Sequence, residues 1–247
     1  MARRLSELGL VVLVIMVLSA PEAVAQRIDE YHPVQWWWPL MLAGGTVVVF
    51  AMDEPVQNAV QDNRSEDLDE MADVMSTFKD PKVFGVAVGG LLAAGLVTQE
   101  YAVARTGLQV AAAYGLSSAF FYSAKWLFGR SRPSDVESAW EFDWLSGGET
   151  ASFASGSSAV VFSLAATLAD AIDHPAASVV LYTGAALNSW SRVNDNRHWV
   201  SDVAVGAVMG IAAAKLVNGK WRVFGIAPPN FLINPHGGAQ LAWNVGF

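Results

Sequence analysis

A histidine and an aspartate at helical spacing form the pair with the clearest chemical use in this sequence. His198 precedes Asp202 by four positions, and positions i and i+4 lie on one face of a helix. We expect the Asp202 carboxylate to accept a hydrogen bond from the His198 ring, which leaves the other ring nitrogen as a nucleophile or base. Arg192, six positions earlier, would balance a dianionic group. Because no further histidine or cysteine lies nearby, a metal site is not expected.

Three cations follow one another closely near the end of an apolar stretch. Lys125, Arg130 and Arg132 lie within eight positions, and Pro133 restricts the backbone after the last of them. Guanidinium groups bind phosphate oxygens in bidentate fashion, and a lysine adds a point charge, so the group suits a phosphate. A charged loop with Lys125 as an anchor at a membrane surface explains the same residues equally well.

A run of small polar residues precedes the next apolar stretch. The sequence over residues 152–158 is Ser-Phe-Ala-Ser-Gly-Ser-Ser. Ser155 is a favoured residue type for capping a helix, which is one explanation of the run. The other is anion binding, because a helix N-terminus presents unpaired N–H groups and Gly156 lets the backbone approach a ligand closely. The run alone does not decide between the two.

Taken together, the three groups resemble the superfamily that includes lipid phosphate phosphatases (type 2 phosphatidic acid phosphatases), bacterial acid phosphatases and vanadium haloperoxidases. The sequence reads Lys-x6-Arg-Pro, a Ser-Gly helix start, and Ser-Arg-x5-His-x3-Asp, and the likeness spans residues 83–217. The resemblance implies that His198 attacks phosphorus to form a phosphohistidine, with Asp202 orienting it. The residues to which it assigns phosphate binding are Lys125, Arg132, Ser155, Gly156 and Arg192.

One position departs from that family's pattern. The family reads Pro-Ser-Gly-His at the helix start, whereas residues 154–157 of this chain are Ala-Ser-Gly-Ser. In the family this histidine protonates the leaving oxygen, and the hydroxyl of Ser157 is a very poor acid at neutral pH. General acid catalysis typically contributes about 10²–10⁴-fold. We therefore expect Ser157 to occupy a catalytic position with little catalytic effect.

The leading interpretation is a phosphoric monoester or pyrophosphate hydrolase, slowed by the loss of its general acid. The alternative is a phosphate- or lipid-phosphate-binding protein without turnover. A vanadate-dependent oxidase on the same scaffold is less favoured, because the sequence has no separate sign of halide chemistry. The first two functions predict a phosphorylated partner, such as a lipid phosphate or an isoprenoid pyrophosphate, and no cofactor is expected.

Composition and hydrophobic patterning indicate the elements that position these residues. Of the 247 residues 53% are hydrophobic and 15% are charged, which favours a membrane-embedded helical protein or an unusually apolar bundle. The net charge of −8 argues against a nucleic-acid partner. The fold expected is an all-α, six-helix bundle of the phosphatase and haloperoxidase type, with a short β-like tail. The six apolar stretches cover residues 36–52, 83–98, 106–128, 157–172, 176–190 and 199–217.

Two segments outside these stretches have patterns of their own. The acidic residues 53–80 are expected to form a solvated flank that contains an amphipathic helix. Its apolar face would consist of Leu68, Met71, Val74, Met75 and Phe78. The C-terminal tail alternates as a strand does, and residues 221–227 could pair with it. The alternating residues of the tail are Leu241, Trp243, Val245 and Phe247.

The N-terminus resembles an export signal, with Arg3 and Arg4 before an apolar stretch and Ala-Val-Ala at residues 23–25. An uncleaved membrane helix is the alternative. We expect a signal peptide (1–25), an N-terminal helix with the acidic segment (26–82), a phosphatase-type core (83–218) and a tail (219–247).

The location expected is the bacterial cell envelope, in the inner membrane or periplasm with the site facing the periplasm. If a cleaved signal were followed by six crossings, the motifs would face the cytoplasm. A periplasmic site therefore requires that one stretch does not cross, or that the bundle is a folded periplasmic domain.

Overall fold

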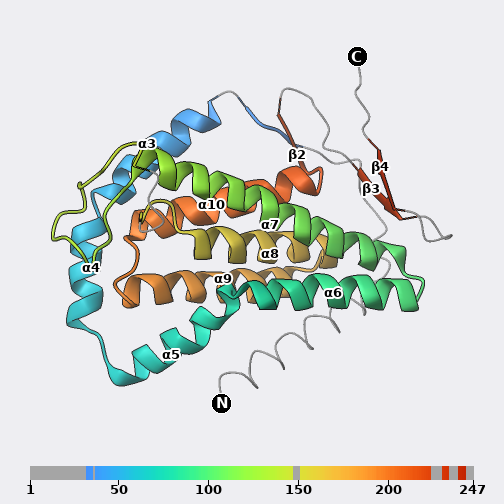
Figure 1. The fold of residues 1–247 in the computed structure, drawn as a ribbon, viewed down its shortest axis with the longest axis horizontal. Coiled ribbons are helices and arrows are strands. Elements are labelled where there is room, and N and C mark those ends of the chain that lie inside the picture. Colours follow the sequence, from blue (N-terminus) through green and yellow to red (C-terminus); the bar gives the residue numbers. More distant parts are fainter. Residues whose placement is uncertain (1–31, 36, 147–150, 224–229, 234–238, 243–247) are drawn as a thin grey trace.

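The computed structural model describes residues 32–35, 37–146, 151–223, 230–233 and 239–242, and within them the fold is predominantly helical (Figure 1). The predicted all-α fold is confirmed. Its helices are α3 (Trp38–Phe50), α4 (Asp53–Asp62), α5 (Glu66–Ser76), the 3₁₀ helix η1 (Thr77–Lys79), α6 (Pro81–Val97), α7 (Tyr101–Phe128), α8 (Gly156–Ile172), α9 (Pro175–Asn194) and α10 (Val200–Val217).

The six apolar stretches correspond to α3, α6, α7, α8, α9 and α10, with ends that differ by a few residues. The amphipathic segment forms α5 and continues into η1. Phe78 is half-buried as expected, whereas Met71, at 37% exposure, lies on the surface. Helix α4 is an additional element that the hydrophobic pattern did not predict. The expected signal peptide lies outside the described residues, and the division into segments stays a prediction.

Helix α8 lies at the centre of the bundle, in contact with α7, α9 and α10 (Figure 1). Its closest neighbour is α10, because glycines let the two backbones meet. A Cβ atom at Gly206 would lie 2.4 Å from the Ser155 carbonyl oxygen, and one at Gly210 would lie 2.1 Å from that of Ala159. Neither position has room for a side chain. This contact fixes the start of α10 against the start of α8.

Helices α4 and α5 pack on the last turns of α9 through polar contacts. Gln57 Nε2 donates to the Val193 carbonyl oxygen at 3.3 Å. Asn194 Nδ2 donates to Asp69 Oδ1 at 2.8 Å, and Asn188 Nδ2 donates to the Met75 carbonyl oxygen at 2.6 Å. These contacts fix α5 along the C-terminal half of α9, and Phe78 of η1 lies further back, in a groove lined also by Leu181 and Gly184 of α9.

The acidic segment is not simply a solvated flank. Asp53, its first residue, is fully buried. The expectation of a solvated surface is therefore wrong at this position, because Asp53 is paired with a buried arginine, Arg130.

Four short strands lie outside the bundle. β1 (His32–Pro33) pairs in parallel with β2 (Trp221–Arg222), and β3 (Asn230–Ile233) pairs antiparallel with β4 (Ala239–Ala242). The predicted pairing of residues 221–227 with the tail is wrong for Trp221 and Arg222, which pair with β1. A connection of five residues joins β3 to β4, and short connections favour antiparallel neighbours. Residues 243–247 of the predicted tail strand lie outside the described part.

One described helix, Val200–Val217, is long and apolar enough to cross a membrane. Residues Glu66–Lys79 and Pro81–Val97 pass the same test only as a pair, bent by 52°. These findings concern length and composition alone.

Candidate functional site

The polar residues predicted to carry chemistry lie at one end of the bundle, at the ends of four of its helices. Helices α7 and α9 end there, and α8 and α10 begin there. Lys125 lies in the last turn of α7, and Arg192 lies in the last turn of α9. Ser155 caps the start of α8, and its N–H donates to the Asp202 carbonyl oxygen at 3.0 Å. The alternation of helix directions therefore brings three distant segments together.

His198 is buried and contacts Asp202 through a serine. Its Nδ1 lies 3.7 Å from Asp202 Oδ2, which is too far for a hydrogen bond, and 3.3 Å from Ser152 Oγ. The predicted direct hydrogen bond is thus replaced by a relay. The single hydroxyl proton of Ser152 is donated to Asp202 Oδ2, so Ser152 Oγ accepts from His198 Nδ1–H. This arrangement leaves His198 Nε2 with its lone pair.

The environment of His198 keeps the ring neutral. Burial lowers its pKa to about 4, and the charges of Lys125 and Arg132 act in the same direction, while the Asp202 carboxylate opposes them. A neutral imidazole is the form that can attack an electrophile. Sequence reasoning did not select Ser152, although the residue stands in the run before α8.

Arg130 is the most completely enclosed cation of the site, with no exposed surface. Its guanidinium donates to Asp202 Oδ1 at 2.8 Å, to Asp53 Oδ2 at 2.6 Å and to Ser201 Oγ at 2.7 Å. The Phe50 ring covers it at 4.3 Å from the ring centroid. Every one of these partners belongs to the protein, so Arg130 orients Asp202.

Asp53 completes this buried network. Its Oδ1 accepts from the Ser201 N–H at 2.8 Å, and its Oδ2 accepts from the Ser201 hydroxyl at 2.6 Å. Burial raises the pKa of Asp53, against the effect of these hydrogen bonds. Nothing in the sequence indicates that Asp53 pairs with Arg130 and Ser201, because these partners lie 77 and 148 positions away.

A left-handed turn after α7 directs Arg130 inward. Gly129 ends the helix with φ at 52°, and a Cβ atom there would lie 1.9 Å from the Asp143 carbonyl oxygen. Lys125, one turn earlier, donates from Nζ to the carbonyl oxygens of Ala151 and Ser152. Lys125 therefore holds the segment that leads into α8 as well as contributing charge.

Arg192 has capacity to bind an anion. Its side chain is buried, and NH1 donates to Asp195 Oδ2 at 2.7 Å. Its Nε is buried with no hydrogen-bond partner among the described residues. The Arg192 carbonyl oxygen accepts from the His198 N–H at 3.2 Å, which fixes the two residues relative to each other. Arg132 is half-buried, and burial, then the charge of Arg197, lowers its pKa.

The start of α8 agrees with the capping interpretation of the serine run, and anion binding there stays a prediction. The Ser155 hydroxyl accepts from the Ser158 N–H at 3.4 Å and from the Ser158 hydroxyl at 3.2 Å, so it acts as a helix cap. A Cβ atom at Gly156 would lie 2.9 Å from the Phe121 ring. Ser157 is partly exposed, and its hydroxyl has no hydrogen-bond partner in the described part of the chain. That hydroxyl holds no other residue of the site in place.

Lys79, at the end of η1, is a cation that sequence reasoning did not select. It is half-buried, and burial, then the charge of Arg192, lowers its pKa, with Arg197 and Arg132 acting in the same direction. Positive charges from four segments thus converge at this end of the bundle. Such a convergence suits an anion with several oxygens. Within the described residues, no cluster of three His, Cys, Asp or Glu side chains could hold a metal ion.

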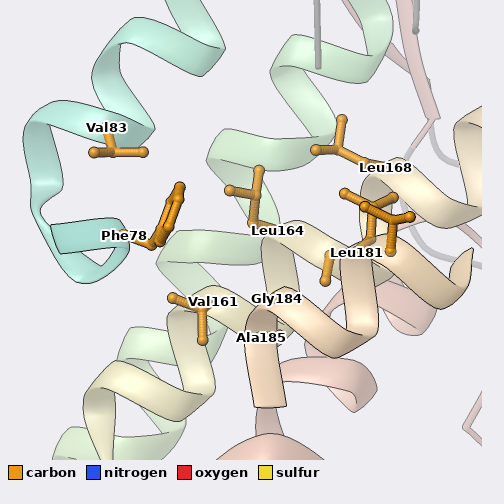
Figure 2. Close-up of a pocket in the computed structure, with 10 residues that line it drawn as sticks. Phe78, Val83, Val161, Leu164, Leu168, Leu181, Gly184 and Ala185 are labelled. Atoms are coloured by element: carbon orange, nitrogen blue, oxygen red, sulfur yellow. The ribbon is translucent and has the colours of Figure 1, made fainter. Parts of the chain in front are cut away.

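An apolar groove of about 220 Å³ lies between η1, α6, α8 and α9 (Figure 2). Phe78, the neighbour of Lys79 in the chain, points into it. Other residues that line it include Val83, Val161, Leu164, Leu181 and Gly184.

Comparison with known proteins identifies the fold. A family model described as the PAP2 superfamily matches residues 106–222. The crystal structure of Aquifex aeolicus LpxE is similar, with a TM-score of 0.53 and 20% identity over 67% of this chain and 94% of that chain. So is that of the first transmembrane PAP2 type phosphatidylglycerolphosphate phosphatase from Bacillus subtilis, with a TM-score of 0.57 and 19% identity over 74% of this chain and 95% of that chain. A search of curated proteins found no match.

The matched segment contains the motif positions from Lys125 to Asp202 and the helices α8, α9 and α10 that carry most of them. The two similar structures share this arrangement of helices over most of their lengths. Residues 106–222, slightly less than half of the chain, are thus the part that matches the PAP2 superfamily.

Proposed function

We propose that the chain is a phosphatase that hydrolyses phosphoric monoesters or pyrophosphates through a phosphohistidine on His198. The observation that carries the proposal is the contact of His198 Nδ1 with Ser152 Oγ at 3.3 Å, because it leaves Nε2 free to attack phosphorus. Lys125, Arg132 and Arg192 supply positive charge for the phosphoryl oxygens. Electrostatic stabilisation of this kind is usually the largest contribution to phosphoryl transfer.

The reaction has two steps. His198 Nε2 forms a bond to phosphorus while the bond from phosphorus to the leaving oxygen breaks, and that oxygen keeps the electron pair. The positive charge that develops on the ring is balanced by Asp202 through the Ser152 hydroxyl. Water then attacks the phosphorus, the N–P bond breaks, and phosphate and a proton are released as His198 returns to its neutral form.

Ser157 limits the range of substrates. A serine hydroxyl does not readily protonate an alkoxide as it leaves, so alkyl phosphates are expected to react slowly. Aryl phosphates and pyrophosphates carry leaving groups that need little protonation. We therefore propose a preference for these activated substrates.

Hydrolysis of p-nitrophenyl phosphate by the purified protein tests the proposal. We expect turnover that falls on the order of 10³-fold or more in His198→Ala, because the nucleophile is lost. Lys82→Gln, at an exposed position on α6, is the control: purified in the same way, it should keep the turnover of the wild-type protein. Turnover that is the same in the wild-type protein and in His198→Ala would refute the phosphohistidine.

Ser157→His tests the assignment of the missing acid. With an alkyl phosphate as substrate, we expect a gain of about 10²–10⁴-fold in kcat. The gain with p-nitrophenyl phosphate should be much smaller, because that leaving group needs no proton. Equal gains on both substrates, or none, would contradict the role assigned to position 157.

A phosphate-binding protein without turnover is the second candidate, and the same Ser157 favours it. Binding of inorganic phosphate, measured by calorimetry, together with no hydrolysis of activated esters would support this function. Turnover that disappears with His198→Ala would exclude it.

We further propose a phosphorylated lipid as the substrate and the cell envelope as the location, with export and a periplasmic site. The groove that starts at Phe78, next to Lys79, offers apolar surface to a hydrocarbon chain whose phosphate lies among the cations. The name of the similar Bacillus subtilis protein specifies a lipid phosphate and a transmembrane protein, which agrees with this proposal.

A further inference from the structure

The indole of Trp199 joins two of the sequence motifs. Trp199 directly follows His198 in the chain and is only 2% exposed. Its ring N–H donates to the Ser131 carbonyl oxygen at 3.0 Å. Because Ser131 directly precedes Arg132, one side-chain hydrogen bond connects the segment of the proposed nucleophile with the segment of a proposed phosphate-binding cation.

The backbone of Trp199 is fixed independently of its ring. Its main-chain N–H donates to Asp202 Oδ2 at 2.8 Å, and its carbonyl oxygen accepts from the Val203 N–H at 3.3 Å. Both bonds use main-chain atoms of Trp199, so they persist when the side chain changes. A substitution at position 199 therefore removes the contacts of the ring and keeps those of the backbone.

Backbone hydrogen bonds also hold the residues directly before Arg132. The Arg130 carbonyl oxygen accepts from the Ser152 N–H at 2.7 Å, and the Ser131 N–H donates to the Glu141 carbonyl oxygen at 3.0 Å. The next polar atom of the main chain is the Ser131 carbonyl oxygen, which accepts from the indole. Since the peptide bond between Ser131 and Arg132 is planar, a fixed oxygen also fixes the direction in which the chain enters Arg132.

On the basis of the phosphatase function proposed above, we propose that Trp199 is a positioning residue, whose indole N–H sets Arg132 in place for the phosphoryl oxygens. The indole does not itself contact the phosphate and acts through the peptide bond before Arg132. Loss of the ring N–H leaves the Ser131 carbonyl oxygen without this donor and lets the peptide bond rotate. Arg132 then binds phosphate less well, although its charge is kept.

Binding of inorganic phosphate, measured by calorimetry, tests the positioning role without relying on turnover. Trp199→Phe keeps an aromatic ring and removes the ring N–H. We expect the dissociation constant to rise about fivefold to tenfold, as loss of one hydrogen bond would cause. Trp126→Phe, the same substitution at an exposed position in the last turn of α7, is the matched control and should leave the dissociation constant unchanged.

A double-mutant cycle separates an effect through Arg132 from a general loss of stability. Arg132→Gln alone should weaken phosphate binding about tenfold or more. Trp199→Phe added to Arg132→Gln should then change the dissociation constant by less than about twofold. The Trp199 ring also lies 5.4 Å from Arg130 Cζ. Equal fold-changes from Trp199→Phe in the two backgrounds would overturn the proposal, because the ring would then act through Arg130 or through the fold as a whole.

The remaining outcomes also decide the matter. If Trp199→Phe does not fold, the benzothiophene analogue of tryptophan at position 199 keeps the shape of the ring with sulfur in place of the N–H, and the same rise is expected. A dissociation constant equal to that of the wild-type protein would overturn the role of Trp199. Wild-type protein that binds no phosphate, or Arg132→Gln that binds it equally well, would do the same. Hydrolysis that does not depend on His198 would overturn the phosphatase and leave the binding result in force.

Discussion

At the scale of single residues, the protonation of His198 decides whether the site can act. The ring has lost water on burial, and Asp202 compensates for only part of that loss, so its pKa lies near 4 instead of about 6.5. The ring is then neutral throughout the range in which an exposed histidine would titrate. The nucleophilic attack proposed for His198 consequently needs no prior deprotonation at physiological pH.

An NMR titration of the histidine rings tests this assignment. We expect one of the four histidines to titrate with a midpoint near pH 4, and its signal to be absent in His198→Ala. Because the unfolded chain binds this proton at a higher pH than the folded chain does, the free energy of unfolding should fall as the pH decreases from about 6.5 to about 4. A midpoint near 6.5 for His198 would contradict the neutral, desolvated ring.

The pairing of Arg130 with Asp53 provides a second test at this scale. Asp53→Asn keeps the shape of the side chain but leaves Arg130 with one carboxylate partner in place of two. Removing one member of a buried ion pair typically costs about 3–5 kcal/mol of unfolding free energy. We expect a lower Tm in thermal unfolding. We also expect a lower kcat, because an Arg130 side chain that Asp53 no longer holds would orient Asp202 less firmly. Asp62→Asn, at an exposed position on the same helix, is the matched control. Equal Tm values in the two variants would contradict the stabilising role of the Asp53–Arg130 pair.

The residues of the motifs could be predicted, and their partners could not. His198, Asp202 and Arg192 stand at spacings that have a direct chemical meaning. Ser152 and Asp53 form their hydrogen bonds with distant segments, and nothing in their local sequence distinguishes them from a helix cap or a solvated acid. For this reason the relay through Ser152 replaced the direct hydrogen bond that helical spacing predicted.

At the scale of elements, the contact between α8 and α10 sets the position of the turn that is proposed to bind phosphate. Gly206 lies under the Ser155 carbonyl oxygen, and the Ser155 N–H in turn donates to the Asp202 carbonyl oxygen. A methyl group at position 206 would push the start of α8 away from the start of α10. The distance between the helix that carries Ser157 and the helix that carries Asp202 therefore depends on the missing side chains of Gly206 and Gly210.

Gly206→Ala tests this dependence. We expect a loss of about 1–3 kcal/mol of unfolding free energy, typical of overpacking, together with reduced phosphate binding. Gly184→Ala on α9 is the control, because a Cβ atom there meets nothing within 4 Å. Alanine also favours a helix over glycine, so that variant should be as stable as the wild-type protein or more stable. A Gly206→Ala variant with unchanged Tm would show that the two helices can separate without cost.

Hydrophobic pattern predicted the long helices of the bundle and missed the short elements that complete the site. Stretches of apolar residues longer than a strand leave few alternatives to a helix. Helix α4 is polar over most of its length, and its burial depends on Gln57 and Asp53 finding partners on α9 and at the start of α10. The strand pair β1–β2 joins segments almost 190 positions apart, and no local pattern specifies such a pairing.

At the scale of the whole molecule, the end of the bundle that carries the site differs from the opposite end. The cations and buried carboxylates lie where α8 and α10 begin. β2 follows the C-terminal end of α10 and holds β1 there (Figure 1). An 18-residue helix is about 27 Å long, so His32 and His198 lie far apart along the bundle.

The chain lacks cysteine, which makes this separation easy to probe. Single cysteines introduced in place of His32 and of Arg197, the exposed residue directly before His198, would each report their side of a membrane to an impermeant thiol reagent. If the bundle crosses the membrane, we expect the two positions to be labelled from opposite sides in intact and opened cells. Labelling of both from the same side would indicate a bundle that lies on one side of the membrane.

The buried network around Arg130 also bears on how the molecule folds. The helix pairs α6–α7 and α8–α9 join neighbours in sequence, and contacts of this kind form early because little loop entropy opposes them. Asp53, Arg130 and Ser201 are separated by 77 and 148 positions, so their meeting requires that nearly the whole chain is already in place. The ability to orient Asp202 should thus appear last during refolding, after helicity has recovered. Phosphate binding then reports a completed fold, and a chain with only its helices formed carries no working site.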